Sequence, residues 1–166
     1  MTRPGTPTRQ RRSTKSKSKR DVTLANEQPR QNPTIERALI IHPEPLEWIL
    51  SGKKVWEIRS KPTKIRGPIT LQEKGSKKIM GTCALVDCLG PLTVDEFITH
   101  ADKMNYARAE LEDEREELEE DMEYGVYAWV LADVKALPKP IRFQNPSGAV
   151  TWVQLPQRVM DKLSPA

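Results

Sequence analysis

Gly52-Lys53-Lys54-Val55-Trp56-Glu57-Ile58-Arg59 is the stretch that decides the fold, because a strand carrying both signs of charge directly follows a helical pattern. Residues 44–51 predict a helix that ends at Gly52, a residue typical of helix C-termini. Lys, Glu and Arg on a half-buried strand are costly unless they are paired or bind a ligand. We therefore expect the functional site in this stretch.

The side chains of a strand alternate between its two faces, so this stretch divides into two sets. If Trp56 and Ile58 are buried, Glu57 and Arg59 point outward, and Lys54 joins them only if the turn before it reorients its side chain. On the functional interpretation, Lys54, Glu57 and Arg59 line one cleft, where the guanidinium fork holds a phosphate or a base edge. The alternative is a structural salt bridge at Glu57.

The segments around this stretch predict a small mixed sheet. Apolar or alternating runs predict strands near residues 38–41, 54–59, 69–71, 78–88, 127–134, 141–143 and 150–155, and capping patterns predict helices over 44–51, 96–100 and 107–122. Val159-Met160 is expected to add a last short piece. Because the helices are grouped between strands, the pattern favours an α+β fold, a mixed or antiparallel β-barrel with two or three flanking helices.

Charge is distributed unevenly along the 166 residues. Residues 1–20 hold eight Lys or Arg and no acid, so the net charge of +4 for the chain leaves −4 for residues 21–166. Residues 1–37 are polar and contain prolines, which predicts a disordered basic tail ahead of one domain over residues 38–160. The tail is either an arm that holds nucleic acid through phosphates or a solvated segment.

An acidic helix is predicted over about residues 107–122. Ten Asp or Glu lie between Glu110 and Glu123, against Arg115 alone, and the apolar stripe is narrow. Such a run is usually a solvated face, and it repels nucleic acid. Its alternative role is to contact a basic protein partner or the basic tail.

The cysteines and the N-terminus bear on the compartment. Cys83 and Cys88 are about 16 Å apart if they share a strand, too far for a disulfide, which favours a reducing compartment. We expect a cytoplasmic protein, with an organelle transit peptide at the N-terminus as the alternative. No apolar run approaches the ~18 residues of a membrane span. No Cys/His spacing is typical of zinc, so neither a metal nor a cofactor is expected.

The Gly52–Arg59 stretch resembles the G-x-K-x-x-E-x-R signature of ASCH domains, a family named after a transcription-coactivator homology region. Residues 66–69, 127–131 and 148–153 also resemble this family, so the likeness spans about residues 38–155. The resemblance implies a PUA-like β-barrel, a fold often used in RNA recognition. It also implies that RNA, another nucleic acid or a modified nucleoside binds in a cleft beside the motif.

The residues expected to contact a base or nucleotide in that cleft are basic or aromatic. Arg59 belongs to the motif, and Lys61, Lys64 and Arg66 follow it in a basic loop. Such side chains contact phosphates. Trp152 follows a polar turn and is the tryptophan best placed to stack on a base, although tryptophan in a small barrel more often belongs to the core.

Some branches of the family are hydrolases, so enzyme activity stays open. One branch removes the acetyl group of N4-acetylcytidine with Lys, Thr and Glu, and another is a ribonuclease. The Lys falls on Lys54, the Thr on Glu57, and the Glu belongs near residues 99–104, where Asp102 is the nearest acid. The sequence thus predicts a nucleic-acid-binding domain. The alternative is a hydrolase that uses Lys54 and Glu57, with Asp102 third, and the last possibility is an adaptor acting through the acidic helix.

Overall fold

The computed structural model describes residues 33–164, so most of the predicted basic tail lies outside the described residues. The strands are β1 (Arg37–Ile41), β2 (Trp56–Arg59), β3 (Gly67–Glu73), β4 (Lys78–Leu89), β5 (Tyr127–Arg142) and β6 (Trp152–Gln154). The helices are α1 (Pro43–Leu50), α2 (Val94–Thr99), the 3-10 helix η1 (Ala101–Met104), α3 (Arg108–Asp113), α4 (Arg115–Asp121) and α5 (Gln157–Leu163).

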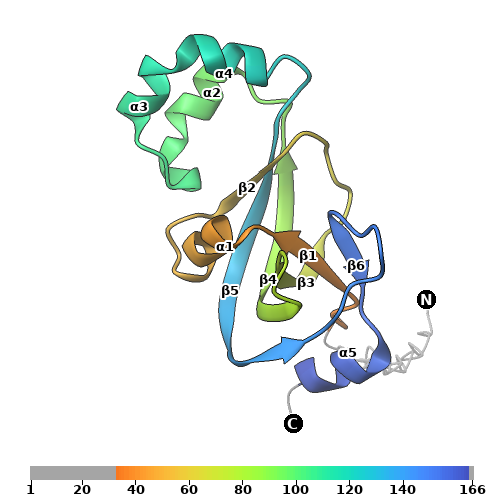
Figure 1. Ribbon diagram of the computed structural model, residues 1–166. Helices are drawn as coiled ribbons and strands as arrows, with labels where there is room; N and C mark the ends of the chain where they lie inside the picture. Colours follow the sequence, from red (N-terminus) through yellow and green to blue (C-terminus); the bar gives the residue numbers. More distant parts are fainter. Residues whose placement is uncertain (1–32, 165–166) are drawn as a thin grey trace, which may run out of the picture. The chain divides into compact units, whose positions relative to one another are not determined.

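All six strands belong to one sheet, in the order β2-β5-β4-β3-β1-β6. β1 and β3 run parallel, whereas the other neighbouring pairs are antiparallel. The register between β4 and β5 shifts at three places, and such bulges bend and twist the strands that carry them. The sheet curls as a result, with α2, α3 and α4 at one end and α5 at the other (Figure 1), which confirms the α+β, barrel-like prediction.

Strand β5 is longer than the sequence pattern indicated. The strands expected at 127–134 and 141–143 are its two ends, joined through a stretch that contains Pro138 and Pro140. The pairing with β4 skips residues 137–140. Because proline has no backbone N–H to donate, the two prolines are tolerated in this bulge, where no ladder hydrogen bond is required.

The acidic run forms two helices instead of the single one expected. Glu114, with φ −97° and ψ 16°, separates α3 from α4. The last predicted piece at Val159-Met160 is also helical and lies within α5, so the described helices outnumber the two or three expected. None of the helices in residues 33–164 has the length and apolar character needed to cross a bilayer.

Three apolar clusters hold these elements together. The first joins α1 to the sheet through Leu46 and Ile49, and the third surrounds Val159 of α5. The second joins β2 to the acidic helices and their neighbours, and its buried members are Trp56, Phe97, Ile98, Ala101, Met104, Leu111, Met122 and Ala128. The charged stretch is therefore fixed between α1 on one side and the helical group on the other.

Gly81 of β4 lets α1 lie directly on the sheet. A Cβ at this position would be 2.6 Å from Cδ2 of Leu50 and 2.7 Å from the carbonyl oxygen of Lys135, so no larger residue fits without a shift. The close approach holds the C-terminal end of α1, and with it the start of the charged stretch, against the sheet.

Candidate nucleic-acid interface

The three charged side chains predicted to share a cleft do converge. Nζ of Lys54 lies 3.3 Å from Oε2 of Glu57, and Nη2 of Arg59 lies 3.0 Å from Oε1 of the same carboxylate. Lys54 is 4% exposed and Glu57 6% exposed, whereas Arg59 is partly buried. Burying such charges is costly unless they are paired, so Glu57 is what makes two neighbouring cations tolerable here.

The turn after α1 explains how Lys54 reaches Glu57. Gly52 has φ +80°, and the N–H groups of Lys53 and Lys54 both donate to the carbonyl oxygen of Trp48, at 2.9 and 3.1 Å. Strand alternation therefore begins only at Trp56, and Lys54 is free of it. The expectation that Glu57 points outward is wrong, because both Trp56 and Glu57 are buried, one on each face of β2.

Arg59 is held firmly by the protein itself. Its Nε and Nη2 both approach Oε1 of Glu57, and Nη2 also donates to the carbonyl oxygen of Ile40 at 2.8 Å. Among the described residues, only Nη1 of this guanidinium has no protein partner. The bidentate fork expected to face a ligand is thus turned to Glu57, and Nη1 is the group left to donate outward.

Oε2 of Glu57 is the less satisfied side of the carboxylate. It is buried and has Lys54 at ion-pair distance, but within residues 33–164 no donor reaches it with hydrogen-bond geometry. A buried oxygen without a hydrogen bond is uncommon in folded proteins. Oε2 of Glu57 and the ammonium of Lys54 can therefore each form a further hydrogen bond.

An aromatic pocket adjoins the ion cluster. The rings of Trp129 and Trp152 stack with centroids 5.6 Å apart and 12° between their planes, and the guanidinium of Arg59 lies 5.7 Å from the centre of the Trp129 ring. The cavity measures about 490 Å³. Its lining residues are Arg59, Ser60, Lys61, Pro62, Thr63, Trp129, Val150, Thr151 and Trp152.

Trp129 forms part of the wall of this pocket. It pairs with Glu57 across β2 and β5, and its indole N–H donates to the carbonyl oxygen of Lys61 at 3.0 Å. Trp129 is 3% exposed, whereas Trp152 is only partly buried. One face of Trp152 is therefore covered by Trp129, and the part of Trp152 that stays accessible lines the pocket.

Of the eight predicted site residues, three line this pocket, Lys54 and Glu57 form the ion cluster beside it, and three do neither. Arg59, Lys61 and Trp152 line it together. Lys64 is exposed outside the lining, and Nη1 of Arg66 donates to the carbonyl oxygens of Thr63 and Ile65, at 3.0 and 2.8 Å. The third is Asp102, described next.

The fold brings Asp102 close to the motif, but among the described residues its side chain forms no ion pair with the motif. It belongs to η1, whose Lys103 carbonyl accepts a hydrogen bond from the N–H of Val55 at 2.8 Å. The carboxylate of Asp102 is exposed, and in residues 33–164 it forms no ion pair with Lys54. The same residues hold no group of three or more His, Cys, Asp or Glu placed to bind a metal.

Sequence reasoning missed two aromatic residues of the site. Trp152 and not Trp129 was chosen as the tryptophan that stacks, and the position of Trp129 opposite Glu57 follows from a strand pairing that local pattern does not specify. Tyr106 is 42% exposed, and partial burial raises the pKa of its hydroxyl, with a further increase from the negative charges of Glu57 and Glu44. Its ring meets that of Trp48 edge-on, at 6.4 Å.

Comparison with known proteins identifies the family of this chain. The sequence profile of the ASCH domain matches residues 39–141. The crystal structure of ASCH from Zymomonas mobilis is 21% identical, covering 77% of this chain and 92% of that chain with a TM-score of 0.54. The crystal structure of a mutant of that protein is 20% identical and covers 77% of this chain and 95% of that chain, with the same TM-score of 0.54. No curated protein sequence matches this chain. The profile spans more than half of the 166 residues and the solved structures share the curled sheet, so the chain belongs to the ASCH domain family.

Proposed function

We propose that this ASCH domain binds RNA and takes one base of a single strand into the pocket beside the ion cluster. The observation that carries the proposal is the grouping of a partly exposed tryptophan, a basic loop residue and a guanidinium around one cavity of about 490 Å³. Aromatic faces with nearby cations are the usual means of binding unpaired bases.

The base would stack on the outer face of Trp152. Its inner face is covered by Trp129 at 5.6 Å between ring centres, so the two tryptophans act as one rigid platform. Trp129 is locked in turn by its hydrogen bond to the Lys61 carbonyl. A platform fixed before binding loses little conformational entropy when a ligand arrives.

The phosphates would be contacted by Lys61 and by Nη1 of Arg59. Lys61 is exposed at the mouth of the pocket, and Arg59 lies on its wall. The buried cluster of Lys54, Glu57 and Arg59 carries one net positive charge, which favours an anion close by. Glu57 holds Arg59 in place, so the guanidinium needs no reorganisation on binding.

Anisotropy titration of a fluorescein-labelled, unstructured 12-residue RNA tests this proposal. Trp152→Ala should weaken binding by about 5- to 150-fold, the range expected for losing one stacked base. Tyr124→Ala is the matched control, since Tyr124 is 88% exposed and lies outside the pocket lining, and should leave the affinity within about twofold. Equal affinities for the two variants, or no RNA binding at low salt, would overturn the proposal.

The same titration tests how much the basic side chain of Lys61 contributes to RNA binding. Lys61→Ala should reduce the slope of log K against log salt by about 0.7, the loss expected for one phosphate contact to a single strand. Lys139→Ala is the control, because Lys139 is equally exposed but lies on the proline-containing part of β5. A slope reduced equally by both changes would mean that binding follows net charge and not this pocket.

A hydrolase is the second candidate, and the spare capacity of the Lys54–Glu57 pair is the observation that favours it. Oε2 of Glu57 lacks a hydrogen-bond donor in the described part of the chain, and Lys54 is the cation beside it. A lysine in such a setting can act as a base or stabilise an oxyanion. Thr63 and Thr151 line the adjoining pocket, whereas Asp102 forms no ion pair with Lys54 in the part of the chain that the structure describes.

A search for reaction products distinguishes the RNA-binding domain from the hydrolase. The protein is incubated with a panel of RNAs and modified nucleosides, including N4-acetylcytidine, and the products are identified by mass spectrometry. If it is a hydrolase, Lys54→Ala abolishes product formation while the circular dichroism spectrum is retained. RNA binding without any product supports the binding domain instead.

A further inference from the structure

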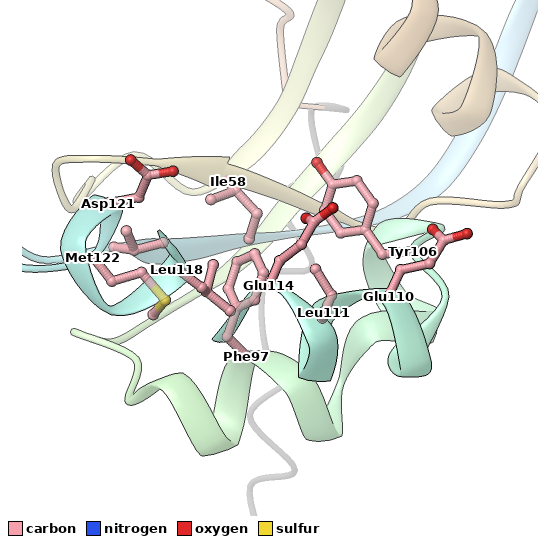
Figure 2. Close-up of a pocket in the computed structure, with 10 residues that line it drawn as sticks. Ile58, Phe97, Tyr106, Glu110, Leu111, Glu114, Leu118, Asp121 and Met122 are labelled. Carbon is pink, nitrogen blue, oxygen red and sulfur yellow. The ribbon is translucent and has the colours of Figure 1, made fainter. Parts of the chain in front are cut away.

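An apolar groove lies between β2 and the helical group, on other residues than the RNA pocket. Phe97 of α2, Leu111 of α3 and Leu118 of α4 converge in it together with Met122, and Ile58 of β2 closes one side (Figure 2). Ile58 follows Glu57 directly, so strand alternation turns it to the opposite face. The groove measures about 470 Å³, within the range of roughly 300–1,000 Å³ typical of binding pockets.

Carboxylates surround this groove. Glu110, Glu114 and Asp121 line it and are exposed, and Figure 2 shows them spaced along it with Glu114 between the other two. None of the three forms an ion pair within residues 33–164, since Arg115 pairs with Asp95 at 2.8 Å and with Glu112 at 3.0 Å. Phe97, Leu111 and Met122 are 6%, 9% and 8% exposed where they line the groove, and the carboxylates along it favour a partner of opposite charge.

The charges and side chains of the candidate occupants decide between them. Nucleic acid is repelled, because residues 110–123 carry ten acids against Arg115 alone, a net charge of −9. A second copy offers residues 21–166, which fit poorly because they have a net charge of −4, and its basic residues 1–20, which are considered next. The basic residues 1–20 could match the charge, but they include no Leu, Ile, Val, Phe, Trp or Tyr to enter the groove.

We propose that this groove binds a basic amphipathic helix of a partner protein. Apolar side chains three and four residues apart on such a helix would enter between Phe97, Leu111 and Leu118. Lys and Arg on its flanks would face Glu110, Glu114 and Asp121. Both features of the groove are then used, because the apolar surface is covered and each carboxylate gains a cation.

The test uses the full chain and a fluorescein-labelled 18-residue probe made of Leu, Ala and Lys, with all its Leu on one helical face. A second peptide has the same composition with the Leu spread around the helix. The amphipathic probe should bind at least about 10-fold more tightly, because only it can insert its apolar side chains together. Equal affinity of the two peptides would show attraction by charge alone and would overturn the proposal.

Matched variants locate the binding surface. The double substitution Glu114→Lys and Asp121→Lys should weaken binding of the probe at least about 10-fold. Glu116→Lys with Glu119→Lys makes the same charge change in α4 at positions outside the groove, and should cost less than about threefold. Leu118→Ala should also weaken binding, with no change of charge. Equal losses for the two charge pairs, or no loss with Leu118→Ala, would contradict an apolar groove site.

The same protein samples also test the other two candidate occupants of the groove, which are the chain's own basic tail and a second copy of the chain. A peptide of residues 1–32 that binds more tightly than the probe, and loses affinity in the Glu114/Asp121 variant, would identify the chain's own tail and overturn the proposal. So would a dimer, detected by light scattering, that this variant dissociates. Probe affinity unchanged by Trp152→Ala would support a site separate from the RNA pocket.

Discussion

At the scale of single residues, Glu57 organises the site. One carboxylate pairs with Lys54 and Arg59, and Arg59 in turn reaches the Ile40 carbonyl and the ring of Trp129. Buried ion pairs often add little net stability compared with apolar residues of the same shape, yet removing one partner is costly because the other charge stays unpaired. Glu57 thus serves to hold two cations at a fixed position beside the pocket.

Glu57→Gln should therefore be strongly destabilising. The change removes the anion from Lys54 and Arg59, and we expect the free energy of unfolding to fall by about 3–5 kcal/mol in urea titrations. Asp87→Asn is the matched control, since the Arg66–Asp87 contact at 3.7 Å is exposed and should be worth at most about 1 kcal/mol. Similar losses for the two variants would show that the Glu57 cluster is not energetically special.

The two cysteines should differ in reactivity. Burial raises the pKa of the Cys83 thiol to about 12, whereas Cys88 is partly exposed. Only the thiolate reacts with iodoacetamide, and at pH 8 about one Cys83 thiol in ten thousand is ionised. Peptide mapping should find Cys88 labelled well before Cys83 in the native protein, and both labelled at similar rates in urea. Equally fast labelling in native buffer would contradict the burial of Cys83.

At the scale of elements, α2 connects the acidic helices to the motif strand. It begins with a capping box, in which Thr93 Oγ1 accepts from the N–H of Glu96 at 3.1 Å and the Glu96 carboxylate accepts from the N–H of Thr93 at 2.8 Å. Phe97 and Ile98 then pack in the cluster that contains Trp56 of β2. The start of α2 therefore contributes to the placement of the charged stretch.

Thr93→Ala should cost about 0.5–2 kcal/mol of stability, because one N–H at the start of α2 loses its acceptor. Thermal unfolding followed by circular dichroism measures the change. Thr99→Ala, at the exposed end of the same helix, serves as the control and should have little effect. If the two substitutions lower the melting temperature equally, the capping box contributes nothing measurable.

At the scale of the whole molecule, charge is distributed unevenly along the chain. Residues 1–20 carry eight cations, the tryptophan pocket is lined by Lys61 and Arg59, and the helices α3 and α4 carry the acidic run. Long-range fields of this kind direct where charged partners approach. RNA is thus expected at the tryptophan pocket and a basic partner at the acidic groove.

The basic tail should add to RNA binding through phosphate contacts. Replacing all eight Lys and Arg of residues 1–20 with Gln should lower the salt slope of log K by up to about 5–6, at roughly 0.7 for each lost contact. A control with Ser13, Thr14, Ser16 and Ser18 changed to Ala keeps the charge and should keep the slope. If the Gln variant retains the original slope, the tail is a solvated segment and not an arm.

The sequence alone predicted the elements whose signals are local. The stop at Gly52, the alternating strand that became β4 and the G-x-K-x-x-E-x-R pattern were sufficient for the α+β class and the family. The tertiary structure decided the rest, because it depends on pairing across the sheet. Trp129 faces Glu57 only through the β2–β5 register, and Trp152 reaches Trp129 only because the sheet curls. The sequence already offered a salt bridge at Glu57 as an alternative, and long-range packing determined that this bridge lies beside a tryptophan platform.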